Sequence, residues 1–308
     1  MIHTITLNPA VDYFMSMADG IQPNELNAAS ETHTEAGGKG INCSIVLNNL
    51  GVPSQMHALL GGATGKYIES QIASYPLIHN CSVEIAGTSR INVKITGKEE
   101  YILNAPGPKV TKQELDKFLS TFHKLTEEDY VILSGKAPQG TPTTFLYDIA
   151  DIVNDAKAKL ILDTRDMRLE DLTYCQPWLI KPNLEELGDL LGTKANLNNA
   201  MELTAAAIAK GAQNVLLTMG SQGCVFAGNL GHAVARSPQI KVKNTTGAGD
   251  TSLAAFVGTW AASHKLEDAL RWSMAAGTAA AAQGALPAMD AIQSWLSSIR
   301  IEKADGQS

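Results

Sequence analysis

The stretch Asn244-Thr-Thr-Gly-Ala-Gly-Asp-Thr-Ser252 carries the strongest local signal in this chain. Apolar residues from Leu253 to Trp260 follow it at helical spacing, so we expect a helix that begins near Gly249. The glycines allow a tight turn, and the unpaired N–H groups and positive dipole end of the helix then point back at that turn. The stretch therefore predicts a site for an anion such as a phosphate group.

Asp250 is the unusual residue of this stretch, because it puts a carboxylate into the first helical turn. One interpretation is structural, since an acidic side chain there complements the helix dipole or caps the helix. The other is chemical: phosphoryl transfer to an alcohol needs a base beside a phosphate-binding turn, because the acceptor hydroxyl must lose its proton. The flanking glycines and hydroxyl side chains favour the chemical interpretation.

A second glycine-rich stretch, Gly37-Gly-Lys-Gly-Ile-Asn42, also stands where a helix is expected to begin. Its glycines let a ligand approach the backbone, and Lys39 supplies a mobile positive charge. The amide of Asn42 can both donate to and accept from a hydroxyl. A glycine turn that carries a surface lysine is the alternative.

Other nucleotide-binding motifs are missing from the sequence. Gly61-Gly-Ala-Thr-Gly-Lys66 is one residue short of the P-loop spacing, and Tyr67 stands where Ser or Thr would hold Mg²⁺, so we reject it as an ATP motif. No strand, turn and helix carry G-x-G-x-x-G with a ribose-binding acid, which leaves a dinucleotide-dependent oxidoreductase with little support.

Apolar runs bounded by turn residues alternate with helical patterns along most of the chain, as in a parallel sheet covered by helices. The expected core strands lie at Ile2–Leu7, Gln55–Leu60, Tyr130–Leu133, Leu160–Asp163, Trp178–Ile180 and Asn214–Met219. The expected helices lie near Gly40–Leu50, Thr141–Asn154, Leu184–Leu191, Leu197–Lys210, Gly249–Ser263 and Glu267–Gln283. This order predicts an α/β fold.

One region departs from that pattern. Between Arg90 and Thr96, apolar and polar residues alternate, which is the period of a strand with one dry and one wet face. With Tyr13–Met17, Val83–Ile85 and Tyr101–Leu103, this strand predicts a small antiparallel sheet beside the main domain. We place Lys94 on a solvated strand face.

Composition excludes several classes of function. The 308 residues carry 24 Lys and Arg against 31 Asp and Glu, so no global field attracts nucleic acid or an anionic membrane. The longest apolar stretches are too short to span a bilayer, and the N-terminus lacks a signal-peptide pattern. Four cysteines without a C-x-x-C pair indicate reduced thiols. We expect a cytoplasmic enzyme or binding protein.

Four stretches, in order, resemble the ribokinase-like (PfkB) carbohydrate kinase family, and within it the branch that contains 1-phosphofructokinase and tagatose-6-phosphate kinase. They are Thr6-Leu-Asn-Pro-Ala-Val-Asp12, Gly37 to Asn42, Lys181-Pro-Asn-Leu-Glu-Glu-Leu187 and Asn244 to Asp250. The resemblance implies a Rossmann-like, mostly parallel central sheet with helices on both faces and a small β-sheet lid. We expect one α/β kinase domain over residues 1–308, a lid formed by segments 11–36 and 83–105, and a possible homodimer through the lid.

The resemblance also implies roles for the residues of the two glycine-rich stretches. Asp250 would be the base that takes the proton from a sugar hydroxyl. The amides of Gly247, Ala248 and Gly249 would stabilise the charge on the transferred phosphoryl group.

On the substrate side, the resemblance implies that Asp12, Gly38 and Asn42 hold sugar hydroxyls. Lys39 and Arg90 would grip the phosphate that the sugar already carries, since the planar guanidinium suits a phosphate better than a neutral hydroxyl. The alternatives are an Asx turn for Asp12 and a surface salt bridge for Arg90.

At the nucleotide end, Asn183 and Glu186 lie three residues apart at the start of an expected helix and so share one face. They either cap that helix or, as the resemblance implies, help to place Mg²⁺ through water. The resemblance implies that ATP is bound near Lys181, Asn183, Thr218, Gly220 and Gly223. Gly220 and Gly223 also fit a hairpin turn that leads into the next strand.

The chain departs from that branch at three places. Ser134-Gly-Lys-Ala-Pro138 replaces S-G-S-L-P, Asp163-Thr-Arg-Asp166 replaces D-x-S-G, and Ile102 with Leu103 replaces an acidic residue. The first change puts the cation of Lys136 near the sugar end, and the second exchanges a small turn for the charges of Arg165 and Asp166. They affect substrate identity rather than the chemistry at Asp250.

The resemblance therefore implies an ATP-dependent kinase of a ketohexose monophosphate, a phosphotransferase with a small sugar phosphate as its partner. Fructose 1-phosphate is the first acceptor expected, and tagatose 6-phosphate or fructose 6-phosphate are alternatives. A kinase of free sugars or nucleosides is a rival within the enzyme class. A sensor that binds sugar phosphate without turnover is a rival outside it, although sensing would not need the base or its glycines.

Overall fold

The computed structural model describes residues 1–18 and 20–303. Its main sheet consists of β1 (Ile2–Thr6), β4 (Ser54–Gly61), β5 (Ile78–Asn80), β6 (Val83–Ile85), β9 (Tyr130–Ser134), β10 (Lys159–Asp163), β11 (Leu179–Ile180), β12 (Asn214–Thr218), β13 (Cys224–Gly228), β14 (Gly231–Arg236) and β15 (Arg300–Lys303). The order is β15-β14-β13-β12-β11-β10-β9-β1-β4-β5, with β6 paired to β4. The strands from β5 to β12 in this order, and β6 beside β4, pair in parallel, whereas β13, β14 and β15 form an antiparallel edge. The expected mostly parallel sheet is confirmed.

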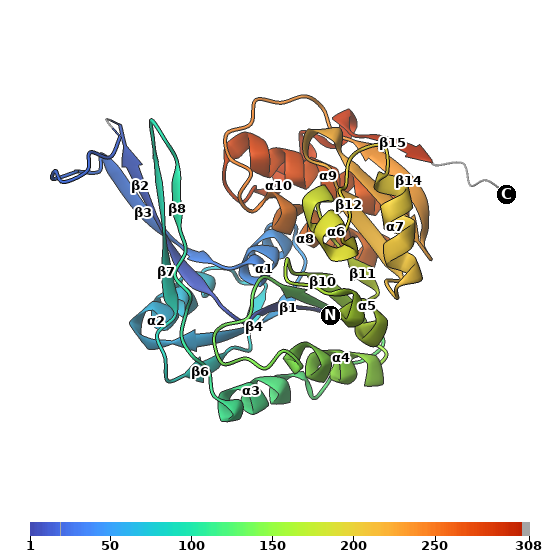
Figure 1. The fold of residues 1–308 in the computed structure, drawn as a ribbon, viewed down its shortest axis with the longest axis horizontal. Helices are drawn as coiled ribbons and strands as arrows, with labels where there is room; N and C mark the ends of the chain where they lie inside the picture. The colour runs from blue at the N-terminus through green and yellow to red at the C-terminus, as the bar shows by residue number, and fades with distance from the viewer. Residues whose placement is uncertain (19, 304–308) are drawn as a thin grey trace.

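Helices cover both faces of this sheet, as Figure 1 shows. They are α1 (Lys39–Asn49), α2 (Gly62–Ile72), α3 (Lys112–Leu119), α4 (Phe145–Asp155), α5 (Leu169–Cys175), α6 (Leu184–Leu191), α7 (Ala200–Ala209), α8 (Ala248–Ser263), α9 (Leu266–Gln283) and α10 (Met289–Gln293). Among the described residues, none of these helices is long and apolar enough to cross a membrane.

Alternate side chains of the buried strands pack into different cores. On β9, Val131 and Leu133 pack in the core that includes residues of α3 to α7, whereas Tyr130 and Ile132 pack in the core with α1, α8 and α9. Successive strand residues point to opposite faces, so a strand that is covered on both sides must be apolar throughout. This explains why the central strands appear in the sequence as continuous apolar runs.

A second, four-stranded sheet stands apart from the main one (Figure 1). It consists of β2 (Ala10–Met17), β3 (Glu31–Gly37), β7 (Arg90–Gly97) and β8 (Tyr101–Leu103) in the order β3-β2-β7-β8. Two expectations were wrong. Val83–Ile85 pairs in parallel with β4 of the main sheet, and β2 runs parallel to β7, so the small sheet is mixed. Short strands carry no sequence signal for direction or partner, which explains both errors.

The polar face of β7 is the buried one. Ile91 is 48% exposed, whereas Asn92 is buried and the Lys94 side chain is only 12% exposed. The Lys94 ammonium lies 2.6 Å from Oδ2 of Asp12, so the prediction of a solvated Lys94 was wrong. Alternation shows that a strand has two unlike faces, but it does not show which of them meets the rest of the protein.

Candidate active site

A cleft of about 910 Å³ lies between the small sheet and the carboxyl ends of the central strands. That edge of a doubly wound sheet is where ligands usually bind. All fifteen predicted site residues line it: Asp12, Gly38, Lys39, Asn42, Arg90, Lys181, Asn183, Glu186, Thr218, Gly220, Gly223, Gly247, Ala248, Gly249 and Asp250. The rejected loop at residues 61–66 contributes none of the described lining residues. The structure thus brings four distant stretches of sequence to one site.

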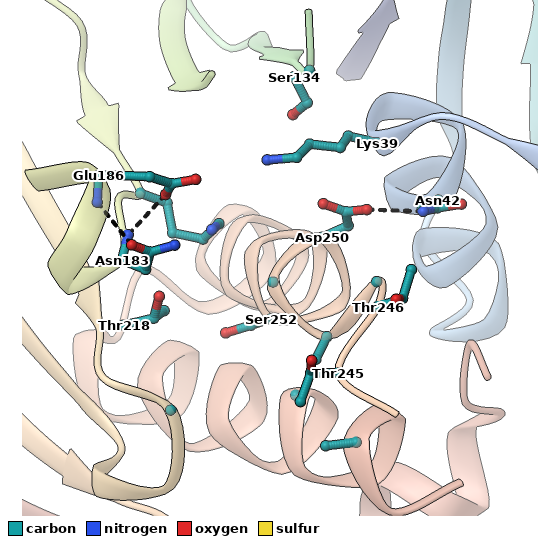
Figure 2. Close-up of a pocket in the computed structure, with 18 of the residues that line it drawn as sticks. Lys39, Asn42, Ser134, Asn183, Glu186, Thr218, Thr245, Thr246, Asp250 and Ser252 are labelled. Carbon is teal, nitrogen blue, oxygen red and sulfur yellow. Dashed lines mark hydrogen bonds between the residues drawn. The ribbon is translucent and has the colours of Figure 1, made fainter. Parts of the chain in front are cut away.

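Asp250 lies in the first turn of α8 and is 6% exposed. Its carboxylate does not cap the helix, whose N-cap is Gly247 with a left-handed φ of 79°. Instead, Oδ2 accepts a hydrogen bond of 2.8 Å from Nδ2 of Asn42, across the cleft from α1 (Figure 2). Burial and the nearby charge of Asp163 raise the pKa of Asp250 to about 6, although Lys39 opposes this shift. A buried carboxylate with this pKa can accept a proton near neutral pH.

Gly247 and Gly249 are required before Asp250 for different structural reasons. Gly247 adopts a backbone conformation that other residues rarely tolerate. A Cβ atom at Gly249 would lie 3.3 Å from Nζ of Lys181, so this glycine leaves room for the ammonium group. The amide of Ala248 already donates to the carbonyl of Thr245 at 3.2 Å. Of the three amides expected to face the phosphoryl group, that of Ala248 therefore has a partner within the turn.

Two lysines share one buried carboxylate at the centre of the cleft. Lys39 and Lys181 each place Nζ 3.3 Å from Oδ1 of Asp163, which is fully enclosed. Burial opposes ionisation, but the two ammonium groups outweigh it and lower the pKa of Asp163. Burial also opposes the charge on Lys39, but Asp163, Asp250 and Glu186 raise the pKa of that lysine. Lys39 is thus ion-paired with Asp163, whereas the sequence analysis expected it to grip the sugar's phosphate together with Arg90.

At the sugar end, Asp12 is bonded on both oxygens. Asn92 donates to Oδ1 at 2.8 Å and Lys94 to Oδ2 at 2.6 Å, which leaves no Asx turn at this position. Neither Asn92 nor Lys94 was among the predicted site residues. Their signal was present in the sequence, since both lie on the same strand face as Arg90.

Arg90 is held by neutral groups. Its Nε donates to the carbonyl of Asn8 at 3.2 Å and its Nη1 to the carbonyl of Ala105 at 2.9 Å. Burial lowers the pKa of Arg90, and the charge of Asp12 counteracts this effect. Within residues 1–18 and 20–303, no carboxylate lies within ion-pair distance of Arg90. The alternative of a surface salt bridge is therefore not found, and the guanidinium faces the cleft with its charge unpaired.

At the other end, Asn183 and Glu186 form a capping box at the start of α6. Oδ1 of Asn183 accepts from the Glu186 amide at 2.8 Å, and Oε2 of Glu186 accepts from the Asn183 amide at 2.9 Å. The capping interpretation is confirmed, and Glu186 also lines the cleft facing Lys39 (Figure 2). In the described part of the chain, no group of three or more His, Cys, Asp or Glu side chains could hold a metal ion.

The predicted hairpin near Gly220 and Gly223 is also present. β12 and β13 pair antiparallel around a short 3₁₀ helix at Gly220–Gln222. Gly223 has a φ of 90°, and a side chain there would collide with the carbonyl of Ala235. Thr218 donates to the carbonyl of Pro182 at 3.3 Å. These backbone contacts hold the loop beside the cleft, and none of them requires a bound nucleotide.

The charged residues among the departures from the family pattern form ion pairs. Lys136 lies 3.1 Å from Asp166, and Arg165 lies 2.5 Å from Glu185. Ser134 ends β9 just before them. Its buried Oγ has no hydrogen-bond partner among the described residues and lies near Lys39 in Figure 2.

Comparisons with known proteins match this architecture. The family described as pfkB family carbohydrate kinase matches residues 5–288. The chain is 35% identical over 305 residues to 1-phosphofructokinase of Borreliella burgdorferi, with 98% of both chains covered. It is 30% identical over 303 residues to D-tagatose-1-phosphate kinase of Bacillus licheniformis, covering 98% of this chain and 99% of that protein. Phosphofructokinase-2 from Escherichia coli, solved in complex with fructose-6-phosphate, shares the fold, with a TM-score of 0.89 at 24% identity over 96% of this chain and 98% of that one.

The matched region contains the small sheet, most of the main sheet and all of the residues that line the cleft. Fold and family together define the class of protein, a phosphotransferase with an alcohol group as acceptor. The chain belongs to the pfkB family of carbohydrate kinases, which confirms the resemblance carried by its four motifs. Membership of a kinase family implies the use of ATP.

Proposed function

We propose that this protein transfers the γ-phosphoryl group of ATP to a hydroxyl of a ketohexose monophosphate, with fructose 1-phosphate as its first acceptor. The observation that carries the proposal is the unpaired guanidinium of Arg90, which faces the same cleft as the buried carboxylate of Asp250. A fixed planar cation at one end suits a phosphate, and a base further along suits a hydroxyl. The names of the two relatives support a phosphorylated ketohexose.

In this proposal, Asp250 removes the proton of the attacked hydroxyl while the sugar oxygen bonds to the γ-phosphorus. The bond from that phosphorus to the bridging oxygen breaks, and ADP leaves with the bonding electrons. Lys39 and Lys181 compensate the charge on the transferred group, together with the amides of Gly247 and Gly249. Asn42 orients the carboxylate through its 2.8 Å hydrogen bond.

The substrate's hydroxyls would be held by Asp12, Gly38 and Asn42, and its phosphate by Arg90. ATP would lie along the loop that contains Thr218, Gly220 and Gly223. All of these residues line the cleft, which supports their assignment.

Mg²⁺ would be held at Glu186, with Asn183 beside it, and would help to neutralise the phosphates of ATP. The donor set fits this ion. The capping box uses Oε2 of Glu186, so Oε1 is the oxygen that is available to coordinate a metal ion. One carboxylate supplemented by water and substrate phosphates is a usual Mg²⁺ environment.

We also propose that residues 1–308 act as one domain, and that the small sheet β3-β2-β7-β8 serves as lid and dimer contact, as expected for the segments 11–36 and 83–105 apart from Val83–Ile85. Ile91, Tyr101 and Leu103 are 48%, 37% and 56% exposed and share the face of this sheet that points away from Asp12. A second copy would bury them. Analytical ultracentrifugation should show a species of about twice 32.7 kDa, which Leu103→Glu should convert to the monomer. A monomeric wild type would contradict the proposal.

Coupled ADP release with a panel of acceptors tests the function. The panel contains fructose 1-phosphate, tagatose 1-phosphate, tagatose 6-phosphate, fructose 6-phosphate, fructose and a nucleoside. We expect turnover with one or more ketohexose monophosphates and little with the unphosphorylated acceptors. Turnover of free sugars alone would contradict the role of Arg90, and tight sugar-phosphate binding without ADP release would indicate the sensor.

The pKa of Asp250 predicts the pH dependence of turnover. Below pH 6 the carboxyl group holds its proton and cannot act as base, so kcat/KM should fall about tenfold per pH unit there and level off above. Rates from pH 5 to 8 measure this profile. A sugar phosphate also titrates near pH 6. Asp163→Asn removes a negative charge beside Asp250. If the midpoint of the pH profile reports Asp250, this substitution should move the midpoint to lower pH. An unmoved midpoint would argue against the assignment.

A further inference from the structure

Lys136 and Asp166 form an ion pair at the edge of the cleft that the rest of the fold does not require. Their charged atoms lie 3.1 Å apart, and the side chains are 76% and 58% exposed. An ion pair so open to solvent contributes little to stability and opens at low cost. Both residues line the cleft, so Lys136 is free to exchange Asp166 for an anionic ligand there.

The backbone brings Lys136 and the residue that fixes Arg90 to the same edge of the main sheet. β1 and β9 pair in parallel, and the last matched pair is Ile5 with Leu133. Asn8 and Lys136 each lie three residues beyond this pair, and both line the cleft. The carbonyl of Asn8 accepts the Nε hydrogen bond of Arg90. The loop that carries Lys136 therefore borders the corner of the cleft where this guanidinium is anchored.

A phosphate bound at this corner of the cleft needs a second cation beside Arg90 to balance its charge. A phosphate monoester carries between one and two negative charges near pH 7, whereas Arg90 supplies one positive charge. Lys39, the partner expected from the sequence, is bound to Asp163 near Asp250 instead. Lys94 is bound to Asp12. Among the described residues, Lys136 is the lysine of the cleft lining that is paired with an exposed carboxylate, whereas Lys39 and Lys181 share the buried Asp163.

We propose that Lys136 leaves Asp166 when substrate binds and joins Arg90 on the phosphate that the sugar already carries. This inference rests on the proposed function, because it names a residue that selects the phosphorylated acceptor. Asp166 then acts as a competing anion that holds Lys136 while the cleft is empty. Two of the departures from the family pattern, the cation at 136 and the anion at 166, thus act together in binding this substrate.

Lys136→Met tests the proposal by steady-state kinetics with the best sugar phosphate of the panel. We expect the KM for that acceptor to rise at least tenfold, because a charge-assisted hydrogen bond to phosphate is lost. The kcat, the KM for ATP and the weak rate with fructose should change less than about twofold. Lys136→Arg should recover most of the affinity, and Asp166→Asn should lower the KM by removing the competing anion.

Lys112→Met is the matched control, since Lys112 is also a highly exposed lysine, paired with Asp116 on α3 and outside the cleft. It removes the same charge and should leave every constant unchanged. A KM for sugar phosphate that is unchanged in Lys136→Met, or raised equally in Lys112→Met, would overturn the proposal. Calorimetric titration of both variants with fructose 1-phosphate separates this failure from that of the proposed function. A wild type that binds but does not turn over would refute the kinase assignment, while a loss of binding only in Lys136→Met would still support Lys136.

Discussion

Asp250→Asn should lower kcat by at least about 1,000-fold, because the amide cannot take the proton of the attacked hydroxyl. Binding of ATP and of sugar phosphate should remain within a few-fold of the wild type. The carbonyl oxygen of the introduced amide can still accept the hydrogen bond from Asn42, so the geometry of the site is kept. Coupled ADP release measures kcat, and equilibrium titration measures the two affinities.

The same substitution should not destabilise the protein. The pKa of Asp250 is raised to about 6 in the fold, above its ordinary value of 3.8, so its ionisation opposes folding at neutral pH. Removing the charge should raise the free energy of unfolding, by on the order of 2 kcal/mol at pH 7.5 and by progressively less as the pH falls through 6. Asp116→Asn, at an exposed carboxylate on α3, is the matched control. If Asp250→Asn retained more than a tenth of wild-type kcat, Asp250 would not be the base.

Asp163→Asn should produce the second large effect. Without this carboxylate, Lys39 and Lys181 face each other with no shared counter-charge, and Lys181 is almost completely buried. Breaking such a pair costs about 3 kcal/mol of folding stability, towards the lower end of the usual range because Lys39 is 37% exposed. The displaced lysines should also reduce kcat/KM by about 100-fold. Urea unfolding and ADP release measure the two effects.

A matched control separates positioning from simple destabilisation. Asp171 is likewise a buried carboxylate, paired with Arg168 at 2.8 Å, and it lies outside the cleft. Asp171→Asn should lower stability without moving the pH profile of turnover. Asp163→Asn should do both, since Asp163 raises the pKa of Asp250. Equal pH profiles in the two variants would leave Asp163 with a purely structural role.

Much of this site could be predicted from the sequence because its parts are local. A glycine turn before a helix specifies both a backbone shape and an anion-binding end, so Gly247, Gly249 and Asp250 can be recognised from nine consecutive residues. The central strands were predictable for a similar reason, since burial on both faces requires continuous apolar runs such as Tyr130 to Leu133.

The parts that could not be predicted depend on contacts between distant segments. Asp163 meets Lys39 from 124 residues away, and no local pattern indicates that one carboxylate binds two lysines. Lys94 was assigned to solvent because alternation on β7 does not show which face meets Asp12. β6 was assigned to the wrong sheet because three apolar-polar-apolar residues fit either one. In each case the outcome depends on tertiary contacts, which the local sequence does not show.

A crystal structure with a non-hydrolysable ATP analogue and the preferred sugar phosphate tests the central claim most directly. We predict that the attacked hydroxyl lies about 2.6–3.2 Å from a carboxylate oxygen of Asp250, in line with the γ-phosphorus. The phosphate of the sugar should lie against Arg90. A carboxylate of Asp250 that points away from every sugar hydroxyl in that complex, or a sugar phosphate bound elsewhere, would contradict the account.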